Sequence, residues 1–526
     1  MIDIRPDHLE TVKRILAAHV PECEVRAFGS RVNWTAKDYS DLDLAVVGKE
    51  RLDPQCLSQL TEALENSDLP IRVDVLDWHA ISEKFRKVIE KQFEVVQKAE
   101  KESRDVAGEW RETTLDDIAE FRNGKAISPE RYSSFGRHPV FGSNGQIART
   151  DDVLNTEPII VIGRVGAYCG SVYYISEASW VTDNAIVALP KFGNDLHFLF
   201  YLFSSLGLRR TAIGSAQPLM TQGGLKVVQT KVPLLAQQQA IASVLGALDD
   251  KIESNRHTSQ SLERVARAIF RAWFVDFEPV KAKAAGARSF PGMPQEIFDA
   301  LPTNFVESEL GPVPEGWGVG EMGDIGHQRR EQVAPDDTAE GTAYIGLEHM
   351  PRRCIALTDW GTADTVTSAK SRFTTGDILF GKLRPYFHKV GPAPVDGVCS
   401  TDIVVLSAKR TDGAAWLLML VSSDEFVSHA NQTSAGTKMP RTNWKDMASF
   451  PVALPPADLL GAFQQIAEPM LDLIRQSIWE SRKVAAQRDY LLPKLLSGEV
   501  RVKATDSASS ILEPAAASCK RSPGHE

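Results

Sequence analysis

The spacing of apolar positions divides the first 98 residues into alternating helices and strands. "HLETVKRILAAHV" and "QCLSQLTEALENS" repeat apolar residues at helical spacing,. The shorter runs "EVRAFGS", "DLDLAVVG" and "IRVDVLDW" are bounded by polar residues, as strands are,. The pattern predicts a small α/β domain over residues 1–98, followed by a charged connector.

Two later stretches, residues 237–277 and 458–500, carry apolar residues at a period near 3.5, which is typical of a coiled coil,. Roughly 40 helical residues span about 60 Å. The pattern therefore predicts two long helices that act as spacers. An alternative is that each helix packs only on its own domain, because periodicity alone does not identify the partner.

The chain also contains an internal repeat. "IGRVGAYCGSVYY" (162–174) aligns with "FGKLRPYFHKVGP" (380–392), and the same register of 218 residues aligns "VTDNAIVALPK" with "CSTDIVVLSAK". With a slightly longer offset, "GSAQPLMTQGGLKVV" aligns with "GTKMPRTNWKDMASF". A register that holds across separated segments predicts two similar α/β domains, residues 108–236 and 315–457.

Two segments lie outside these domains and helices. Residues 278–314 are rich in Pro, Gly and Ala and are predicted to form a linker,. Residues 503–526 are small and polar, which predicts a disordered tail,. The predicted fold class is α+β and multidomain: a small α/β domain, then two repeated α/β domains joined by long coiled-coil helices.

Composition narrows the functional classes. The net charge of -10 argues against a protein that binds nucleic acid with its whole surface, but it leaves room for local contacts when a partner supplies positive charge,. Six scattered cysteines form no C-x-x-C pair, which favours reduced thiols in a cytoplasmic protein over zinc or disulfides,. No apolar run reaches the roughly 18 residues of a membrane span, so no membrane partner is expected,.

Residues 108–502 resemble the DNA-specificity subunit of type I restriction–modification enzymes. The segments that carry the resemblance are "GEWRETTLDDIAEFRNGKAIS", "KVPLLAQQQAIASVLGALDDKIESN", "ARAIFRAWFVDFEPVKAK", "SELGPVPEGW" and "LPKLLSGEVRV". The resemblance implies two target-recognition domains, held apart by antiparallel helices, that each read half of a split double-stranded DNA site. It also implies methyltransferase (modification) subunits, two of them, and restriction/translocase subunits as partners. Half-sites on one face of B-DNA lie roughly 34 Å apart, a distance that such helices can set.

The aligned turns and loops offer side chains that suit DNA contact. Arg, Lys, Asn and Gln read base edges in the major groove, and aromatic and hydroxyl groups add contacts. The candidates are Arg164, Tyr168, Gln217, Thr221 and Gln222 in the first domain, and Lys382, Arg384, Tyr386, His388, Lys438, Arg441 and Asn443 in the second. The alternative is that these residues are solvated or shape the turns, and the recurrence of the tyrosine in both domains favours a structural role for it.

The repeated half carries no catalytic signature that we recognise. It lacks the G-x-x-x-x-G-K-[ST] loop of a translocating ATPase and the Asn-Pro-Pro-aromatic signature of amino-methyltransferases,. Methylation, cleavage and ATP hydrolysis would therefore come from partner subunits.

The first domain carries a different constellation. Gly29 and Ser30, ten intervening residues, then Asp41 and Asp43 resemble the minimal nucleotidyltransferases of the DNA polymerase beta superfamily, and Asp74 falls where that family has its third carboxylate. The resemblance implies Mg²⁺ and a nucleoside triphosphate as cofactors, with these five residues as the catalytic set and the three aspartates as metal ligands.

Physical chemistry supports that set. Aspartates two apart on a strand point to the same face and can share metal ions, which stabilise the attacking and leaving oxygens of phosphoryl chemistry. A Gly-Ser turn presents backbone N–H groups and a hydroxyl to phosphate oxygens, and Arg31 is expected to add positive charge,. The alternatives are a strand with ordinary acidic residues and a degenerate domain kept for protein contacts.

Three functions are compatible with this sequence. The first is a DNA-specificity subunit with an accessory nucleotidyltransferase domain. The second is a Mg²⁺-dependent nucleotidyltransferase, such as an adenylylating enzyme, that the later half delivers to DNA. The third is an antitoxin-type module that binds DNA. The length and completeness of the repeat favour the first. The sequence leaves open whether the first domain turns over substrate.

Overall fold

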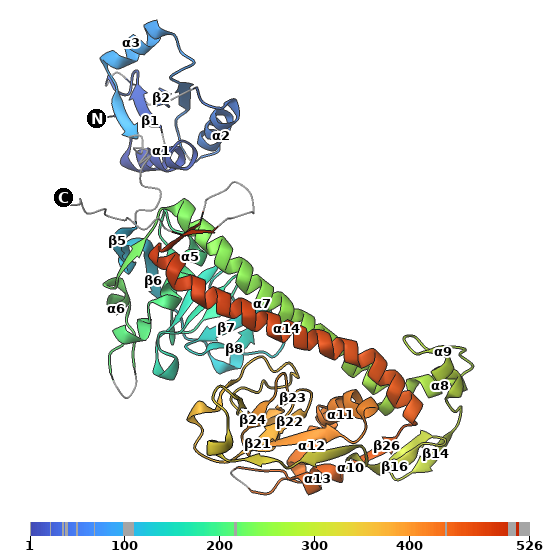
Figure 1. The fold of residues 1–526 in the computed structure, drawn as a ribbon. Helices are drawn as coiled ribbons and strands as arrows, with labels where there is room; N and C mark the ends of the chain where they lie inside the picture. Colours follow the sequence, from blue (N-terminus) through green and yellow to red (C-terminus); the bar gives the residue numbers. More distant parts are fainter. Residues whose placement is uncertain are drawn as a thin grey trace, which may run out of the picture. The chain divides into compact units, whose positions relative to one another are not determined.

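The computed structural model describes residues 2–21, 23–33, 36, 40–48, 51–67, 69–97, 110–214, 218–436, 439–502 and 512–514. The chain divides into two compact units, Met1–Glu109 and Trp110–Glu526 (Figure 1). None of the described helices is long and apolar enough to cross a membrane.

The first unit is a four-stranded sheet with helices on both faces. Its helices are α1 (Pro6–His19), α2 (Pro54–Glu65) and α3 (Glu83–Lys91), and its strands are β1 (Glu24–Phe28), β2 (Leu42–Val47), β3 (Val73–Asp77) and β4 (Glu94–Gln97). The strand order is β3-β2-β1-β4, with β1 antiparallel to β2 and β2 parallel to β3. Leu44 of β2 packs with α1 and α2, whereas its neighbour Ala45 packs with Ile89 of α3. The alternation of side chains along β2 thus supplies both cores.

The second unit begins with the first repeated domain. Its strands are β5 (Arg111–Thr114), β6 (Ala119–Asn123), β7 (His138–Gly142), β8 (Gly145–Thr150), β9 (Ile159–Gly163), β10 (Val172–Ile175), β11 (Trp180–Val181), β12 (Ala185–Pro190) and β13 (Gln229–Val232), and its helices are α4 (Leu115–Ile118), α5 (Leu196–Ser205) and α6 (Gln222–Lys226). The central sheet β10-β9-β12-β6 has α5 on one face and the small sheet β11-β7-β8 on the other. Its middle strands read as continuous apolar runs because both of their faces are buried.

The second repeated domain has the same plan. Its strands are β16 (Gly318–Glu321), β17 (Gly326–Arg329), β18 (Gln332–Val333), β19 (Ala343–Ile345), β20 (Gly361–Thr362), β21 (Lys370–Phe373), β22 (Ile378–Gly381), β23 (Val390–Pro392), β24 (Gly397–Cys399), β25 (Ile403–Ala408) and β26 (Pro451–Leu454), and its helices are α10 (Met322–Ile325), α11 (Ala414–Val421), α12 (Asp424–Gln432) and α13 (Trp444–Ala448). The sheet β23-β22-β25-β17 matches β10-β9-β12-β6, and the pair β16·β26 matches β5·β13. The prediction of two repeated α/β domains is confirmed.

Two long helices run side by side between the domains (Figure 1). They are α7 (Leu235–Phe270), which continues as a π-helical turn (Arg271–Val275), and α14 (Ala457–Ser497). Asp249 pairs with Arg488 at 2.6 Å, Asn255 bonds Ser481 at 3.2 Å, and the rings of Phe270 and Phe463 lie 6.1 Å apart. Positions rise along α7 as they fall along α14, so the helices are antiparallel, as predicted.

Each domain core also includes the nearby ends of both helices. In the first domain, Leu245 of α7 and Leu495 of α14 join the buried side chains of α5 and β9. In the second, Phe274 and Phe463 join those of α11 and β22. The helices therefore pack on each other and on the domains. The alternative considered from periodicity, in which each helix packs only on its own domain, is therefore wrong.

The segment 278–314, predicted as a linker, contains regular structure. It forms α8 (Glu278–Ala284), α9 (Gln295–Ala300) and the hairpin of β14 (Phe305–Ser308) and β15 (Gly311–Pro314). Val280, Phe298 and Val313 are buried in the core of the second domain. Its Pro and Gly residues occupy element boundaries, such as Pro279 in the first turn of α8. Their abundance therefore marks turns rather than a loose chain.

After α14 the chain forms β27 (Val500–Val502), which pairs with β28 (Leu512–Pro514). Gly498 ends α14 with φ +77°, and a Cβ there would lie 2.1 Å from Nε1 of Trp110. Only glycine allows this turn and the close approach of the tryptophan. The rest of the predicted tail, residues 503–511 and 515–526, lies outside the described residues.

Candidate functional site

The sheet of the first unit brings the predicted nucleotidyltransferase residues together. Phe28, the last residue of β1, pairs with Asp43 of β2, and Asp43 pairs with Asp74 of β3. Gly29 follows Phe28 directly, so the Gly-Ser turn begins beside Asp43. Gly29 has φ +80°, and a Cβ on it would lie 2.3 Å from Oδ2 of Asp43. Glycine is therefore required here by backbone conformation and by the carboxylate next to it.

The three carboxylates interact electrostatically. Burial, followed by the charges of Asp74 and Asp41, raises the pKa of Asp43 above its ordinary value. Asp74 also pairs with Arg72 at 2.9 Å. A divalent cation would relieve the repulsion among the carboxylates, and carboxylate oxygens are ligands that Mg²⁺ prefers, so the donor set fits this metal. Among the described residues, however, no three His, Cys, Asp or Glu side chains lie close enough together to hold a metal ion in the conformation shown.

Arg31 has a different role from the predicted one. Its side chain is only 7% exposed, and its guanidinium donates to the carbonyl oxygens of Ser40, at 2.7 and 2.9 Å, and of Asp3, at 2.7 Å. These bonds hold the chain just before Asp41. Arg31 therefore positions the carboxylate segment, and the expectation that it adds charge at the phosphates is not supported by this geometry.

The raised pKa of Asp43 predicts the effect of Asp43→Asn on the stability of the domain without metal. An acid whose pKa is raised by folding opposes folding once it is ionised, so this destabilisation is present at neutral pH and disappears as pH falls through the raised pKa toward 3.8,. At pH 7 we expect peptides covering β1 to β3 to exchange hydrogen for deuterium more slowly in the variant, and we expect the difference to disappear at acidic pH,. Asp7→Asn, an exposed carboxylate on α1, is the control. Faster exchange in Asp43→Asn at pH 7 would contradict the electrostatic interpretation.

In the first repeated domain, the two predicted DNA-contacting segments meet. The turn after β9 and the loop before α6 are joined by backbone hydrogen bonds: Gly166 N–H donates to the Pro218 carbonyl at 3.1 Å, and Met220 N–H donates to the Arg164 carbonyl at 2.8 Å. Tyr168 lies on this turn and is 49% exposed. Arg164 donates from Nη1 to the Asp183 carbonyl at 3.2 Å.

The second domain repeats this joint at equivalent positions. Arg384 N–H donates to the Pro440 carbonyl at 2.7 Å, and Thr442 N–H donates to the Lys382 carbonyl at 3.1 Å. Tyr386 is 50% exposed, nearly the same as its counterpart. We name these two paired segments the recognition joints: residues 164–170 with 218–222, and residues 382–388 with 440–443. The exposure of both tyrosines argues against a purely structural role for them.

Several candidate side chains hold the joints in place. Thr221 and Asn443 cap the equivalent helices α6 and α13, accepting from backbone N–H groups at 3.1 and 3.0 Å. With its amide nitrogen toward the Phe121 carbonyl, Gln222 makes a 3.0 Å bond to β6. These three residues bond to backbone groups of α6, α13 and β6 and therefore hold the joints in place,.

The remaining candidates divide by exposure. The side chain of Arg441 is half exposed and forms an ion pair with Asp402 at 3.1 Å. The guanidinium of Arg384 lies 6.0 Å from the ring centroid of Phe387, and the backbone of Arg384 has φ +53°. His388 is only 5% exposed, and its Nε2 lies 2.9 Å from the Ser422 carbonyl. Burial lowers the pKa of His388, which favours the neutral ring. The burial of His388 argues against the predicted DNA contact and favours a role in holding the turn. Gln217 and Lys438 lie outside the described residues.

A groove in the second domain contains residues that the sequence analysis missed. It has a volume of about 310 Å³ and runs between β17 and α13, beside the recognition joint. The groove is lined by Gln328, Arg330, Lys382, Val404, Thr442, Asn443, Trp444 and Lys445. Two more cations, an aromatic ring and an amide thus lie beside Lys382. The basic residues are visible in the sequence, but only the pairing of β17 with β25 brings Arg330 to this place.

Comparison with known proteins gave two family matches. Residues 107–264 match the type I restriction modification DNA specificity domain, and residues 10–102 match the polymerase beta nucleotidyltransferase family. The probable protein adenylyltransferase MntA of Haemophilus influenzae is 51% identical over 100 residues, which are 19% of this chain and 88% of that protein.

The later part of the chain is similar to two specificity subunits. The type I restriction enzyme MjaIX specificity subunit of Methanocaldococcus jannaschii is 25% identical over 328 residues, covering 60% of this chain and 71% of that protein. The EcoDI specificity subunit of Escherichia coli is 22% identical over 360 residues, covering 66% of this chain and 78% of that protein.

Proposed function

Because the chain belongs to the type I restriction–modification specificity-subunit family and carries a first domain of the polymerase beta nucleotidyltransferase family, we propose that residues 110–502 read the two halves of a split double-stranded DNA site. In this proposal, the subunit directs methyltransferase and restriction subunits to the site that it reads.

The observation that carries the proposal is the pair of recognition joints in two domains that pack on the same two helices, α7 and α14. Their backbone hydrogen bonds are the same, but their side chains differ: Arg164 corresponds to Lys382, and Gln222 corresponds to Trp444. An invariant scaffold with different side chains is what two domains need in order to read two different half-sites. The antiparallel helices then set the separation between the two readings.

The chemistry of the joints supports two kinds of contact. Arg and Lys side chains bind phosphates, which fixes position, and the same groups or amides bind base edges, which gives specificity. In the groove of the second domain, we assign Lys382, Arg330 and Lys445 to phosphate or guanine contacts and Trp444 to packing against the sugar or a thymine methyl group,. In the first domain, Arg164 corresponds to Lys382, and Gln222 corresponds to Trp444.

The acidic character of the chain supports a role within a complex. With a net charge of -10, the chain gains little from non-specific attraction to DNA, and its own sequence supplies neither an ATPase loop nor a methyltransferase signature,. Antiparallel helices that carry two equivalent domains offer two equivalent faces to partners. We therefore expect two methyltransferase subunits in the complex.

The test is DNA binding with and without the methyltransferase subunits. The purified chain should bind DNA weakly and lose that binding between 50 and 200 mM salt, because charge neutralisation dominates non-specific binding. Addition of the methyltransferase subunits should give tight, sequence-specific binding and a stable complex that copurifies. Tight, site-specific binding by the isolated chain would contradict the proposal.

For the first domain we propose Mg²⁺-dependent nucleotidyl transfer. Asp41, Asp43 and Asp74 would hold the metal, which stabilises the charge that develops on the transferred phosphoryl group. The Gly29–Ser30 turn would bind the triphosphate through backbone N–H groups and the serine hydroxyl, and Arg31 keeps the carboxylate segment in place,. Similarity to a probable protein adenylyltransferase supports ATP as the donor and a protein as the acceptor.

A further inference from the structure

A buried carboxylate lies in the second half of α7, where the helix faces the second recognition domain. Glu263 is 6% exposed. Its Oε1 accepts from Nη2 and Nε of Arg267, one helical turn later, at 2.8 and 3.0 Å. Its Oε2 accepts from the backbone N–H of Ile355 at 3.1 Å. Both carboxylate oxygens are therefore bonded, and one of the bonds leaves the helix for the second domain.

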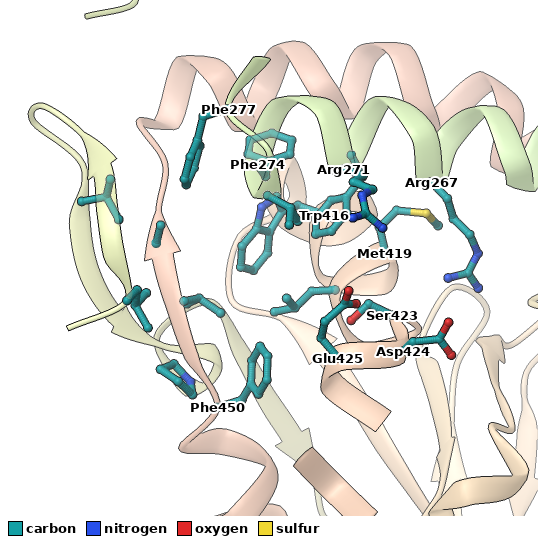
Figure 2. Close-up of a pocket in the computed structure, with 18 residues that line it drawn as sticks. Arg267, Arg271, Phe274, Phe277, Trp416, Met419, Ser423, Asp424, Glu425 and Phe450 are labelled. Carbon is teal, nitrogen blue, oxygen red and sulfur yellow. The ribbon is translucent and has the colours of Figure 1, made fainter. Parts of the chain in front are cut away.

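Arg267 extends the same connection to another segment. Its Nη1 donates at 2.5 Å to the carbonyl of Ser422, a fully buried residue between α11 and α12. The same carbonyl also lies 2.9 Å from Nε2 of His388. Figure 2 shows Arg267 extending from α7 toward the start of α12, where Asp424 lies. One ion pair on α7 thus holds two separate segments of the second domain, and we name Glu263 and Arg267 the α7 lock.

The first recognition domain is attached by different chemistry. There, Oδ2 of Asp249 accepts from the hydroxyl of Tyr201 at 2.6 Å, and Oδ1 accepts from Arg488 of α14 at 2.6 Å. The side chain of Asp249 is 32% exposed, whereas that of Glu263 is 7% exposed. When α7 and α14 are aligned at their first residues, Leu235 and Ala457, the position on α14 that corresponds to Glu263 is Ala485, which carries no charge. Among the described residues, the α7 lock therefore has no counterpart in the first domain.

The lock also differs in kind from the apolar packing around it. Apolar contacts between a helix and a domain are non-directional, so they allow small rotations and shifts along the helix axis. Charge-assisted hydrogen bonds require both short distances and aligned donors. An arginine–carboxylate pair with two N–H bonds to one oxygen, itself bonded to two backbone groups of the domain, therefore defines both the axial position and the rotation of that domain on α7.

We propose that Glu263, through Arg267, is a positioning residue that fixes the distance and the helical phase between the two DNA half-sites. The inference rests on the proposed reading of a split site. One base pair of spacer changes the separation by about 3.4 Å and the rotation by about one tenth of a turn. A domain held only by apolar packing would accommodate such a change more readily than a domain held by the lock.

The experiment uses the complex of the full chain with its methyltransferase subunits. The half-sites are first read from the methylated DNA of cells that carry the wild-type complex. Binding is then measured on three duplexes that have the natural spacer, one base pair more and one base pair fewer. The variants are Glu263→Gln, which keeps the shape and an acceptor for Ile355 but loses the charge, and Glu263→Ala. The control is Glu253→Gln, which removes an exposed carboxylate that pairs with Arg256 on the same helix.

We expect the wild-type complex and Glu253→Gln to prefer the natural spacer equally. Glu263→Gln should reduce that preference at least tenfold while keeping the same bases in each half-site, and Glu263→Ala should reduce it further. An unchanged preference in Glu263→Gln, or a loss of affinity that is equal on all three duplexes, would overturn the inference. If the wild-type complex recognised no split site, the proposed function itself would fail, which is a distinct result.

Discussion

Exchange of residues 108–235 for the first domain of another specificity subunit changes one half of the recognised DNA site and leaves the other half intact. The expectation follows from the independence of the two domains: each has its own sheets and its own recognition joint. Each mismatched base pair costs about 1–3 kcal/mol, so three changed positions should weaken binding to the old half-site by roughly a hundredfold or more. The measurement is the sequence of the methylated sites in cells that carry each complex.

The matched control exchanges residues 315–457 and should change the opposite half. If either exchange altered both halves together, the two domains would not read independently. The spacer should stay the same when residues 108–235 are exchanged, because α7 and α14 keep their length and the α7 lock keeps its bonds to Ile355 and Ser422.

Simultaneous replacement of Asp41 and Asp43 by Asn abolishes nucleotide chemistry in the first domain and leaves DNA recognition unchanged. The double variant removes two of the three proposed metal ligands, and a bound metal contributes several kcal/mol to such a transition state. Nucleotidyl transfer should therefore fall about a thousandfold or more. The fold should survive, because Asp41 is exposed and Asp43 opposes folding when ionised.

The measurement is calorimetry with Mg²⁺ and a non-hydrolysable triphosphate, together with methylation of the target site in cells. Asp7→Asn serves as the control, since Asp7 is an exposed carboxylate paired with Arg5. Absence of nucleotide binding by the wild type would refute the catalytic proposal and leave a scaffold. Loss of methylation in the double variant would show that the two units are functionally coupled.

The local pattern of apolar residues and the register of the internal repeat predicted the two similar domains and the long helices of this protein. The register of 218 residues aligns β9 with β22 and β12 with β25, because continuous apolar runs mark strands that are buried on both faces,. The turns and loops that the repeat aligns are the segments that form both recognition joints. Likewise, the D-x-D spacing predicted that Asp41 and Asp43 lie close together: Asp41 directly precedes β2, Asp43 lies on it, and the sheet register places Asp74 beside Asp43.

The sequence did not reveal which side chains are buried by contacts with residues far apart in the chain. Arg31 and His388 have side chains that suit phosphate and DNA contact, yet both are buried and bonded to backbone carbonyls. The folded segment 278–314 was missed because Phe298 and Val313 bury their side chains in a core formed by residues far along the chain. Nothing in the sequence distinguishes Glu263 from other helical glutamates, because a single glutamate on an amphipathic helix is normally solvated.

We propose that this chain reads a split DNA site through two domains that are joined by one pair of long helices. The most direct measurement is sequencing of the methylated positions in DNA from cells that express the chain with its methyltransferase subunits. We expect one motif with two specified halves, separated by a spacer of fixed length and unspecified sequence. A single contiguous motif, or no methylation that depends on this chain, would contradict the proposed function.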